Sequence, residues 1–350
     1  MVGRVSWLGV WLLGALMCAA PSFADAPLFA SDAPIAFTLE APFARLIARA
    51  PTSIDPWPGE VQLAEPGAPS FLVQVTPRGM SRRIGGFCAF PPLALSFDRA
   101  VVPGTLFEGQ GRLKLVSFCK PAANYEQFVV REYLAYRLYN IITPMSFKVR
   151  AANVTYHDTQ TGRDDRTRFA FLIEGIDDLA RRNDRAELEV VTNSVGYAQL
   201  DPQATTRAAL FEYMIGNLDW DFVSGVAGEK CCHNIKLMAL AGAVNALVPT
   251  PYDFDYSGFV NTPYALPPDN VPVRTVRTRY YRGLCRFKDQ LPEVIAHFRA
   301  HRGDMTALIA GEVRLDEANR RETQAYLDSF FAVLDSPGDT ARAFTSRCTN

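Results

Sequence analysis

The sequence predicts an α+β protein with two lobes, a β-rich lobe followed by an α-rich lobe. Between residues 71 and 173, short and partly alternating apolar runs recur between Pro/Gly turns, which is typical of antiparallel strands. From Asp177 onward, apolar residues recur at helical spacing. The 350 residues also match two domains, or one two-lobed unit, at roughly 150 residues per domain. We place the boundary near residues 173–177.

Composition excludes several classes of protein. The chain carries 36 Lys plus Arg, 37 Asp plus Glu, 48% hydrophobic and 21% charged residues, as expected of a globular protein rather than a disordered or fibrous one. A formal net charge of −1 gives no global basic field, which argues against a non-specific nucleic-acid binder. A local basic patch remains open.

Residues 1–26 have the pattern of a secretory signal peptide. Arg4 precedes an apolar run over 5–20, and small residues follow at Ala24 and Ala26, where we expect cleavage. The sequence therefore predicts an exported protein, periplasmic or secreted; an uncleaved N-terminal anchor is the alternative. No later stretch reaches the roughly 18 apolar residues that a membrane span needs, so no span is expected after cleavage.

The cysteines favour disulfides. Removing Cys18 with the signal peptide leaves 7 − 1 = 6, an even number in a chain bound for an oxidising compartment. Cys88 and Cys119 both lie next to strand-like segments, and we predict that they pair. The other four are expected to pair among themselves. A zinc site is the rival interpretation, but Cys231 and Cys232 are adjacent and the chain has only four histidines.

The β-rich lobe is predicted over residues 71–176, after an arm. Residues 27–70 are rich in Pro and Ala without a sustained period, so we expect an irregular arm with one short strand near 61–63. One helix is predicted from Tyr125 to Asn140, ended by Pro144. Strands are predicted around it, over residues 71–75, 93–97, 112–116, 147–156 and 168–173.

The α-rich lobe is predicted over residues 177–350. Asp201-Pro202 has the pattern of an N-cap followed by proline at the first helical position, and the helix that it begins is expected to end at Gly216-Asn217. Two further amphipathic helices are predicted over residues 291–302 and 315–334.

The densest group of polar residues follows the Pro202 helix. Clustered Asp and Asn oxygens without a Cys/His set suit a hard cation such as Mg²⁺ or Mn²⁺, which can bridge phosphates. One acid could then orient or deprotonate a hydroxyl while the others hold metal. The alternative is that these residues cap local backbone groups at turns. The group consists of Asp219, Asp221, His233, Asn234, Asp253 and Asp255.

These residues occur in an order that resembles a known family. From about Val73 to Gly258 the chain is similar to the spore-coat CotH family of secreted atypical kinases, and more distantly to HipA-like and lipid kinases. The motifs that carry the resemblance are Arg78-Gly-Met-Ser-Arg82, Arg131-Glu-Tyr-Leu-Ala-Tyr-Arg-Leu138, Phe171-Leu-Ile-Glu-Gly-Ile-Asp177 and Tyr252-Asp-Phe-Asp255. The resemblance implies a protein-kinase-like fold, with ATP and Mg or Mn as cofactors.

The resemblance also implies roles for single residues. Asp219 would be the catalytic-loop acid, Asn234 a metal-binding amide and Asp253 the metal-binding acid. Asp255 takes the place of a glycine and joins the metal set, while Asp221 could substitute for either acid.

Glu174 would lie in the hinge and face the nucleotide base or ribose.

A kinase also needs a cation on the nucleotide phosphates and a glutamate to hold that cation. Lys114 lies 132 − 114 = 18 residues before Glu132, near the strand-to-helix spacing of kinase-like folds, and we choose this pair. The CotH-like pattern has lysines after the Arg-Gly loop, whereas residues 88–95 here contain none. Lys120 could replace Lys114, and the loop arginines Arg78 and Arg82 could bind phosphates instead.

The insert Trp220–Cys232 puts Asn234 234 − 219 = 15 positions after Asp219, and it needs to be held in place. A disulfide from Cys231 or Cys232 to Cys285 or Cys348 could do this. We expect His233 to make a local structural contact.

The leading hypothesis is an exported kinase that moves the γ-phosphoryl group of ATP to a hydroxyl of an envelope or secreted protein. The acceptor could also be a small molecule, and nucleotidyl transfer stays open. One alternative is a catalytically silent kinase-like fold that serves as a binding or scaffold module in envelope assembly. A metal-dependent hydrolase that uses Asp219, Asp253, Asp255 and His233 is another.

Overall fold

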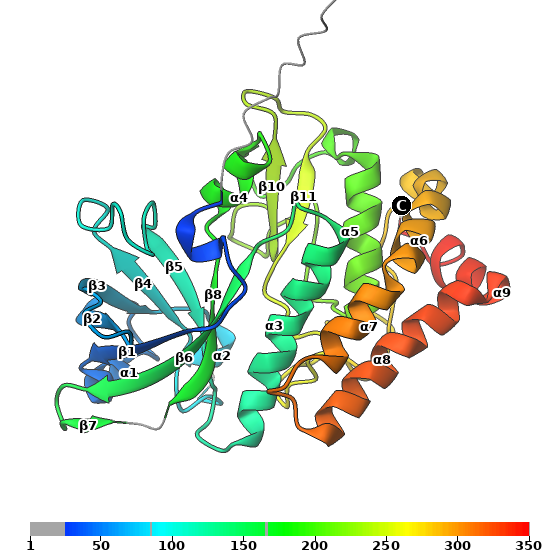
Figure 1. The fold of residues 1–350 in the computed structure, drawn as a ribbon. Helices are drawn as coiled ribbons and strands as arrows, with labels where there is room; N and C mark the ends of the chain where they lie inside the picture. Colours follow the sequence, from blue (N-terminus) through cyan, green and yellow to red (C-terminus); the bar gives the residue numbers. More distant parts are fainter. Residues whose placement is uncertain (1–24, 85, 165–166, 350) are drawn as a thin grey trace, which may run out of the picture.

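The computed structural model describes residues 25–84, 86–164 and 167–349. The predicted signal peptide therefore lies outside the described residues, except for its last two. The protein is a mixed α/β structure in which a curved sheet stands beside a group of helices (Figure 1). The strands of this sheet are β1 (Ile35–Ala41), β2 (Trp57–Leu63), β3 (Ser70–Pro77), β4 (Leu93–Phe97), β5 (Arg112–Val116), β6 (Val149–Asp158), β7 (Arg163–Asp164) and β8 (Arg168–Ile173).

The sheet closes on itself. Its strand order is β1-β2-β3-β4-β5-β8-β6-β7, and β1 also pairs with β6. This closing pair is parallel, with Ile35 opposite Ala152 and Ala41 opposite Asp158, whereas the other pairs are antiparallel. The result is a barrel-like sheet whose interior can be filled by side chains.

Strands β6 and β8 separate two hydrophobic cores, because successive side chains point to opposite faces. In β8, Ala170 and Leu172 belong to the core inside the barrel, while Phe169, Phe171 and Ile173 face helix α3 (Asn124–Ile142). All six residues of β8 are buried. This explains why residues 169–173 form a continuous apolar run, and it fixes α3 against the sheet.

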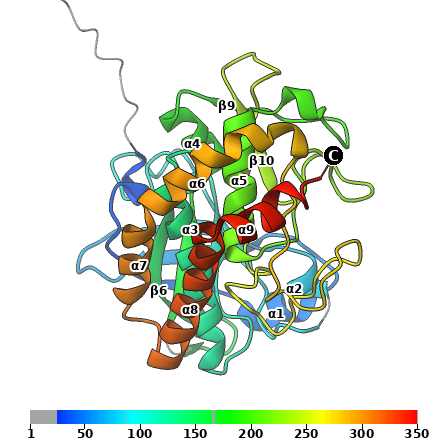
Figure 2. The same cartoon turned by 90° about the vertical axis from the view of Figure 1, so that its right-hand side faces the viewer.

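The second half is mainly helical. Helix α5 (Pro202–Ile215) is central; α6 (Leu291–Ala300), α7 (Arg302–Ala310) and α8 (Glu317–Asp335) form the outer layer in the turned view (Figure 2). A small antiparallel sheet, with the order β11-β10-β9, lies between α5 and the large sheet (Figure 1). The remaining elements are α1 (Phe43–Arg49), α2 (Ser81–Ile84), α4 (Ile176–Arg182), β9 (Ala186–Glu187), β10 (Ile235–Ala239), β11 (Val248–Pro251) and α9 (Pro337–Thr340).

Residues 27–70 differ from the expected irregular arm. They contain β1, α1 and β2, so most of this segment is part of the closed sheet. In β1 the residues alternate between buried and more exposed positions, with Phe37 and Leu39 inside. The neighbouring prolines and alanines concealed this short alternation. The predicted strand near 61–63 is the end of β2.

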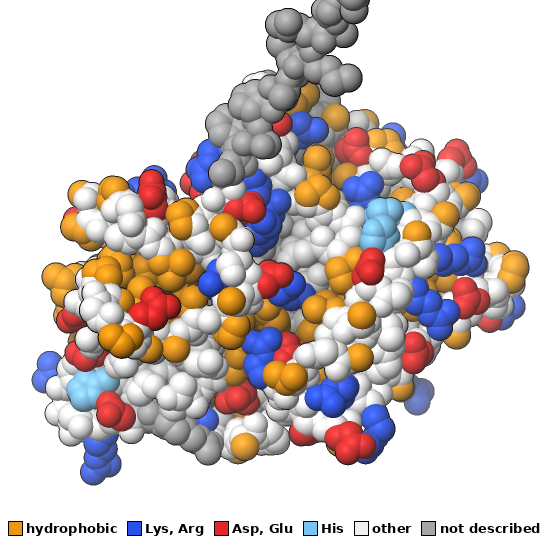
Figure 3. Space-filling model, viewed as in Figure 1, with side chains coloured by type: hydrophobic (Ala, Val, Ile, Leu, Met, Phe, Trp, Pro, Cys, Tyr) orange, Lys and Arg blue, Asp and Glu red, His pale blue; other side chains and the backbone are white. Residues whose placement is uncertain are grey.

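The start of the described chain is held against the sheet and α3. Leu28 and Phe29 are buried, and the Arg150 guanidinium donates to the carbonyl oxygens of Leu28 (3.0 Å) and Ser31. Asp32 pairs with Arg137 at 2.7 Å. Lys and Arg side chains gather on this face, along the boundary between sheet and helices (Figure 3). In the described part of the chain, no helix is both long and apolar enough to cross a bilayer.

The six cysteines among the described residues are at disulfide distance in pairs. Cys88 pairs with Cys119, as predicted. The expectation that Cys231 or Cys232 bridges to Cys285 or Cys348 is wrong: Cys231 pairs with Cys232, and Cys285 with Cys348. Because these sulfur atoms bond to one another, they leave no thiolate set for the zinc interpretation. The paired cysteines are compatible with an exported protein.

Candidate functional site

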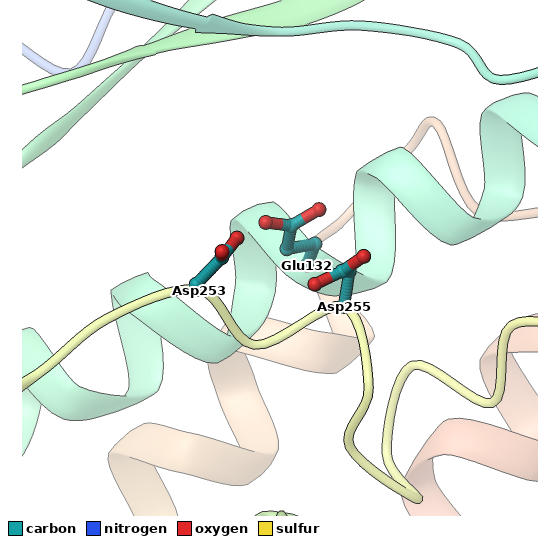
Figure 4. Close-up of side chains that lie close together, drawn as sticks. All are labelled: Glu132, Asp253 and Asp255. Atoms are coloured by element: carbon teal, nitrogen blue, oxygen red, sulfur yellow. The ribbon is translucent and has the colours of Figure 1, made fainter. Parts of the chain in front are cut away.

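Three carboxylates from two distant parts of the chain meet beside α3. Asp253 and Asp255 lie on the segment after β11, and Glu132 lies in the middle of α3 (Figure 4). One ligand oxygen from each lies within 4.8 Å of the others. Asp253 has a left-handed backbone conformation, with φ of 67°, which Asp tolerates better than most residues. Its N–H donates to the Tyr136 hydroxyl at 2.9 Å, which fixes this turn against α3.

Burial changes the charge of this cluster. It raises the pKa of Glu132 to about 8 and that of Asp255 to about 6, although Arg82 opposes both shifts. Burial also disfavours ionisation of Asp253, but the nearby cations Arg82, Arg78, Lys114 and His233 together outweigh it and lower the pKa of Asp253. Asp253 is thus the acid most readily ionised. Glu132 is 2% exposed, and its Oε1 has no hydrogen-bond partner among the described residues.

Three cationic side chains surround the acids. The Arg82 Nε lies 3.3 Å from Asp255 and an Arg82 Nη lies 3.8 Å from Asp253. Arg78 donates through Nε to the Leu93 carbonyl at 3.0 Å, but its buried Nη2 has no partner in the described part of the structure. The Lys114 ammonium lies 4.0 Å from the centre of the Tyr252 ring, and burial lowers the pKa of Lys114 to about 7.

The chosen pair of Lys114 and Glu132 is not formed as an ion pair in the described structure. Lys114, on β5, faces Tyr252, while Arg82, from the short helix α2, is the cation that reaches the acids. Sequence spacing placed Lys114 on the strand correctly, but it could not show that α2 turns into the same space. The sequence analysis named Arg82 only as a possible phosphate ligand, and it missed the contact of Arg82 with the acids.

Asp219 lies in the loop after α5, opposite the acid cluster. The helix ends at Gly216, which has φ of 65°; a Cβ there would lie 2.1 Å from the Tyr326 hydroxyl, so the close approach needs glycine. The Asn234 amide donates to the Asp219 carbonyl oxygen at 2.7 Å and to its carboxylate at 3.1 Å. The chain thus returns Asn234 to Asp219 after the insert.

His233 shares a 2.8 Å hydrogen bond between its Nε2 and the Asp219 Oδ1, and this bond raises the pKa of His233. It therefore contacts the candidate catalytic acid directly, beyond the local structural contact expected from the sequence. Asp221, in contrast, accepts hydrogen bonds from the N–H groups of Val223 (2.8 Å) and Ser224 (2.9 Å), so it orders the loop.

A cavity of about 390 Å³ joins the two groups. Its lining includes the cations Arg78 and Arg82 and the acids Asp219, Asp253 and Asp255; Tyr252, which carries the Lys114 contact, lines it too. The further lining residues are Gly79, Met80, Ser81, Val226, Glu229, Cys232, His233, Asn234 and Tyr256. The structure thus brings most of the sequence-predicted site residues to one cavity.

Glu174 lies elsewhere. Its buried carboxylate accepts from the Arg182 Nε at 2.8 Å and from the Lys148 N–H at 2.9 Å, and it does not line this cavity. These bonds join the start of β6 to α4. Lys120, the alternative to Lys114, places its ammonium 4.1 Å from the centre of the Phe87 ring and also lies outside the cavity lining.

Glu212 is a buried acid that the sequence interpretation missed. It lies on α5 with no exposed surface, beside the Asn217 side chain, and neither of its carboxylate oxygens makes a well-formed hydrogen bond among the described residues. Burial raises its pKa well above the ordinary value. The sequence offered one indication that this acid is buried: Glu212 lies among the apolar residues of α5, one turn before Gly216.

Comparisons with known proteins give only distant likenesses. No protein-family model matches the chain, and no curated protein matches it either. Among solved structures, it is similar to the crystal structure of a Helicobacter pylori proinflammatory kinase, CtkA, with a TM-score of 0.40 and 9% identity over 72% of this chain and 94% of that chain. A likeness this distant establishes neither a family nor an activity, and the CotH-like family has no support from these comparisons.

Proposed function

We propose that this chain is an exported, kinase-like phosphotransferase that moves the γ-phosphoryl group of ATP to a hydroxyl of an envelope or secreted protein, with Mg or Mn. The observation that carries the proposal is the single cavity described above. It combines oxygen ligands for a hard cation, the Arg78 Nη2 that lacks a partner among the described residues, and an acid held by Asn234 and His233. Phosphoryl transfer needs these groups and little covalent chemistry from the protein.

The residues have distinct roles in this proposal. Asp219 accepts the proton of the attacking hydroxyl as its oxygen bonds to the γ-phosphorus, and the bond from that phosphorus to the β–γ bridging oxygen breaks to release ADP. Arg78 and Lys114 bind the phosphates. Asp253 and Asp255 supply oxygen ligands that suit a hard divalent cation, whose bound form would neutralise phosphate charge.

Two buried atoms without hydrogen-bond partners among the described residues, the Glu132 Oε1 and the Arg78 Nη2, favour a ligand that contains both a cation and an anion. An unpaired buried carboxylate oxygen and an unpaired buried guanidinium nitrogen are each costly to leave without a partner. A metal-bound nucleotide phosphate can satisfy both. Glu174 is left out of the nucleotide contacts, because Arg182 already occupies its carboxylate.

One observation favours a second function, a binding or scaffold module without catalysis. Arg82 already pairs with both Asp253 and Asp255, so these acids have a cationic partner without metal. A kinase-like fold that uses this ion pair only for structure would be catalytically silent.

Nucleotide binding separates the two functions. We expect ATP with Mn²⁺ to raise the melting temperature of the oxidised mature chain, because a ligand that binds only the folded state stabilises it. Asp253→Ala and Lys114→Met should remove the shift. Lys120→Met removes one lysine charge as Lys114→Met does, but outside the cavity lining, so this variant should keep the shift in melting temperature. No shift at millimolar nucleotide with folded protein would contradict the phosphotransferase and leave the scaffold.

A further inference from the structure

The cluster of Glu132, Asp253 and Asp255 contains a buried carboxylate oxygen that has no hydrogen-bond partner among the described residues. Glu132, almost fully buried, points toward Asp253 and Asp255 (Figure 4), and its Oε1 has no hydrogen-bond partner among the described residues. Arg82 pairs with both aspartates, yet no ion pair joins it to Glu132 in the described structure. Such an oxygen is expected to gain a proton or a cation as its partner.

The composition of the cluster suits a divalent cation. All three donors are carboxylates, and one oxygen of each lies within 4.8 Å of the other two, a spacing that a single ion can bridge with small side-chain shifts. Oxygen-only ligands favour Mg²⁺ or Mn²⁺ over softer metals. Glu132 and Asp255 are buried, so few waters would compete with the ion.

Asn234 is less well placed for this cation than the sequence suggests. Its Nδ2 donates twice to Asp219, to the backbone oxygen and to the carboxylate. The amide is therefore oriented by the opposite wall of the cavity. Glu132, in contrast, lies beside both aspartates.

Arg82 stands where the cation would bind. Its Nε is 3.3 Å from Asp255 and a terminal nitrogen is 3.8 Å from Asp253, so a divalent ion and this guanidinium compete for the same oxygens. Helix α2, which carries Arg82, has only four residues, and the following residue pairs with other groups: Arg83 donates to the carbonyl oxygens of Gly79 (2.9 Å) and Ala50. To free the acids, the Arg82 side chain would have to turn away from them, while Arg83 keeps its own contacts.

We propose that Glu132, Asp253 and Asp255 form a site for one Mg²⁺ or Mn²⁺, and that Arg82 is the counterion that this metal displaces. The displaced guanidinium stays in the cavity beside Arg78, where the phosphates of a nucleotide would bind. The inference rests on the proposed function only for this last step, since the metal site stands without a nucleotide.

The test measures Mn²⁺ binding without nucleotide, by the electron paramagnetic resonance signal of free Mn²⁺, on the oxidised mature chain. Glu132→Gln should weaken binding by about ten-fold or more, because it removes a charged ligand. Asn234→Ala should leave it nearly unchanged. Arg82→Gln should tighten it several-fold by removing the competitor, whereas Arg83→Gln, an equal charge change beside it, should not.

Wild-type protein provides a second readout if Arg82→Gln fails to fold. Mn²⁺ should speed the reaction of Arg82 with phenylglyoxal, measured by mass spectrometry of its peptide, because the side chain leaves its buried ion pair. The inference is overturned if Mn²⁺ binding depends on Asn234 and not on Glu132, if Arg82→Gln weakens it, if Mn²⁺ slows the Arg82 reaction, or if no Mn²⁺ binds at millimolar concentration.

The two proposals fail separately. Mn²⁺ binding through Glu132 without any ATP binding would contradict the phosphotransferase and keep the metal site. ATP binding that needs Asn234 but not Glu132 would contradict the metal site and keep the phosphotransferase.

Discussion

A few buried carboxyl groups are expected to make the stability and ligand binding of this protein depend on pH and on cations. Glu132, Asp255 and Glu212 all lie where burial raises the pKa of a carboxyl group. Asp255 lines the cavity of about 390 Å³, and Glu132 lines a smaller one beside it. Glu212 lies under the loop of Asp219, near Asn217, and has no charged partner within ion-pair distance in the described structure. It is therefore expected to hold a proton in the folded protein at neutral pH.

This state makes the stability of the protein depend on pH. The folded pKa of Glu212 is raised above its ordinary value of 4.5, so the contribution of Glu212 is fully present below about 4.5 and is lost as pH rises toward the folded pKa. Glu212→Gln should remove this loss. Its free energy of unfolding should exceed that of the wild type by a margin that grows from pH 5 to pH 8, measured by urea denaturation.

The matched control is Glu317→Gln, an exposed side chain that should leave the pH dependence unchanged. A margin that stays constant with pH would show that Glu212 is ionised in the folded protein.

At the scale of elements, helix α5 sets the position of the Asp219 loop. Its start is fixed by Asp201, whose carboxylate accepts from the Ala204 N–H at 2.7 Å, with Pro202 at the first helical position. Its end is fixed by Gly216 in the left-handed conformation. The loop that carries Asp219 begins directly after this residue.

Asp201→Ala should lower the free energy of unfolding by about 1 kcal/mol, because the N-cap hydrogen bond is lost. Asp201→Asn keeps an accepting oxygen and should cost much less. Urea denaturation of both variants measures the difference, and equal losses would mean that the cap geometry does not stabilise α5.

Hydrophobic periodicity in the sequence predicted the helices and strands that are long enough to show a clear repeat. Strands β4, β5 and β8 have the predicted bounds, and α3 and α5 agree within a few residues. Strands β10 and β11 were missed, because four or five residues between loops carry too little periodic signal. The predicted helix over residues 291–302 ends at Ala300, and α7 follows it as a separate helix.

The candidate site was predictable only in part for a similar reason. Asp219, Asn234, Asp253 and Asp255 could be found because acids and an amide cluster along the chain after α5. The contact of Arg82 with the acids could not, since it joins positions 255 − 82 = 173 residues apart. The Glu174 contact was missed for another reason: its partner Arg182 is near in sequence but is one of many arginines, and nothing in the sequence singled it out.

At the scale of the whole molecule, the first described residues join the sheet to α3. Arg150, on β6, is almost fully buried and donates to the carbonyl oxygens of Leu28 and Ser31, while Arg137, on α3, pairs with the exposed Asp32. The segment thus contacts both the barrel-like sheet and the helix that carries Glu132.

Arg150→Met should lower the free energy of unfolding by about 2–3 kcal/mol, because charged hydrogen bonds to buried carbonyl groups are lost. Arg137→Met breaks a pair at the surface and should cost under about 1 kcal/mol. Thermal denaturation compares the two, with limited proteolysis near residue 30 as a second measurement. A larger loss for Arg137→Met would contradict the anchoring role of Arg150.

The parallel pair of β1 with β6 has a consequence for how the chain is made. Ile35 and its partner Ala152 are 152 − 35 = 117 residues apart, so the ring of strands cannot close until most of the first half has left the ribosome. Until then β1 presents an unpaired edge that a chaperone could bind and that another nascent chain could join. Completion of β6 is thus the step at which the growing polypeptide loses its open edge.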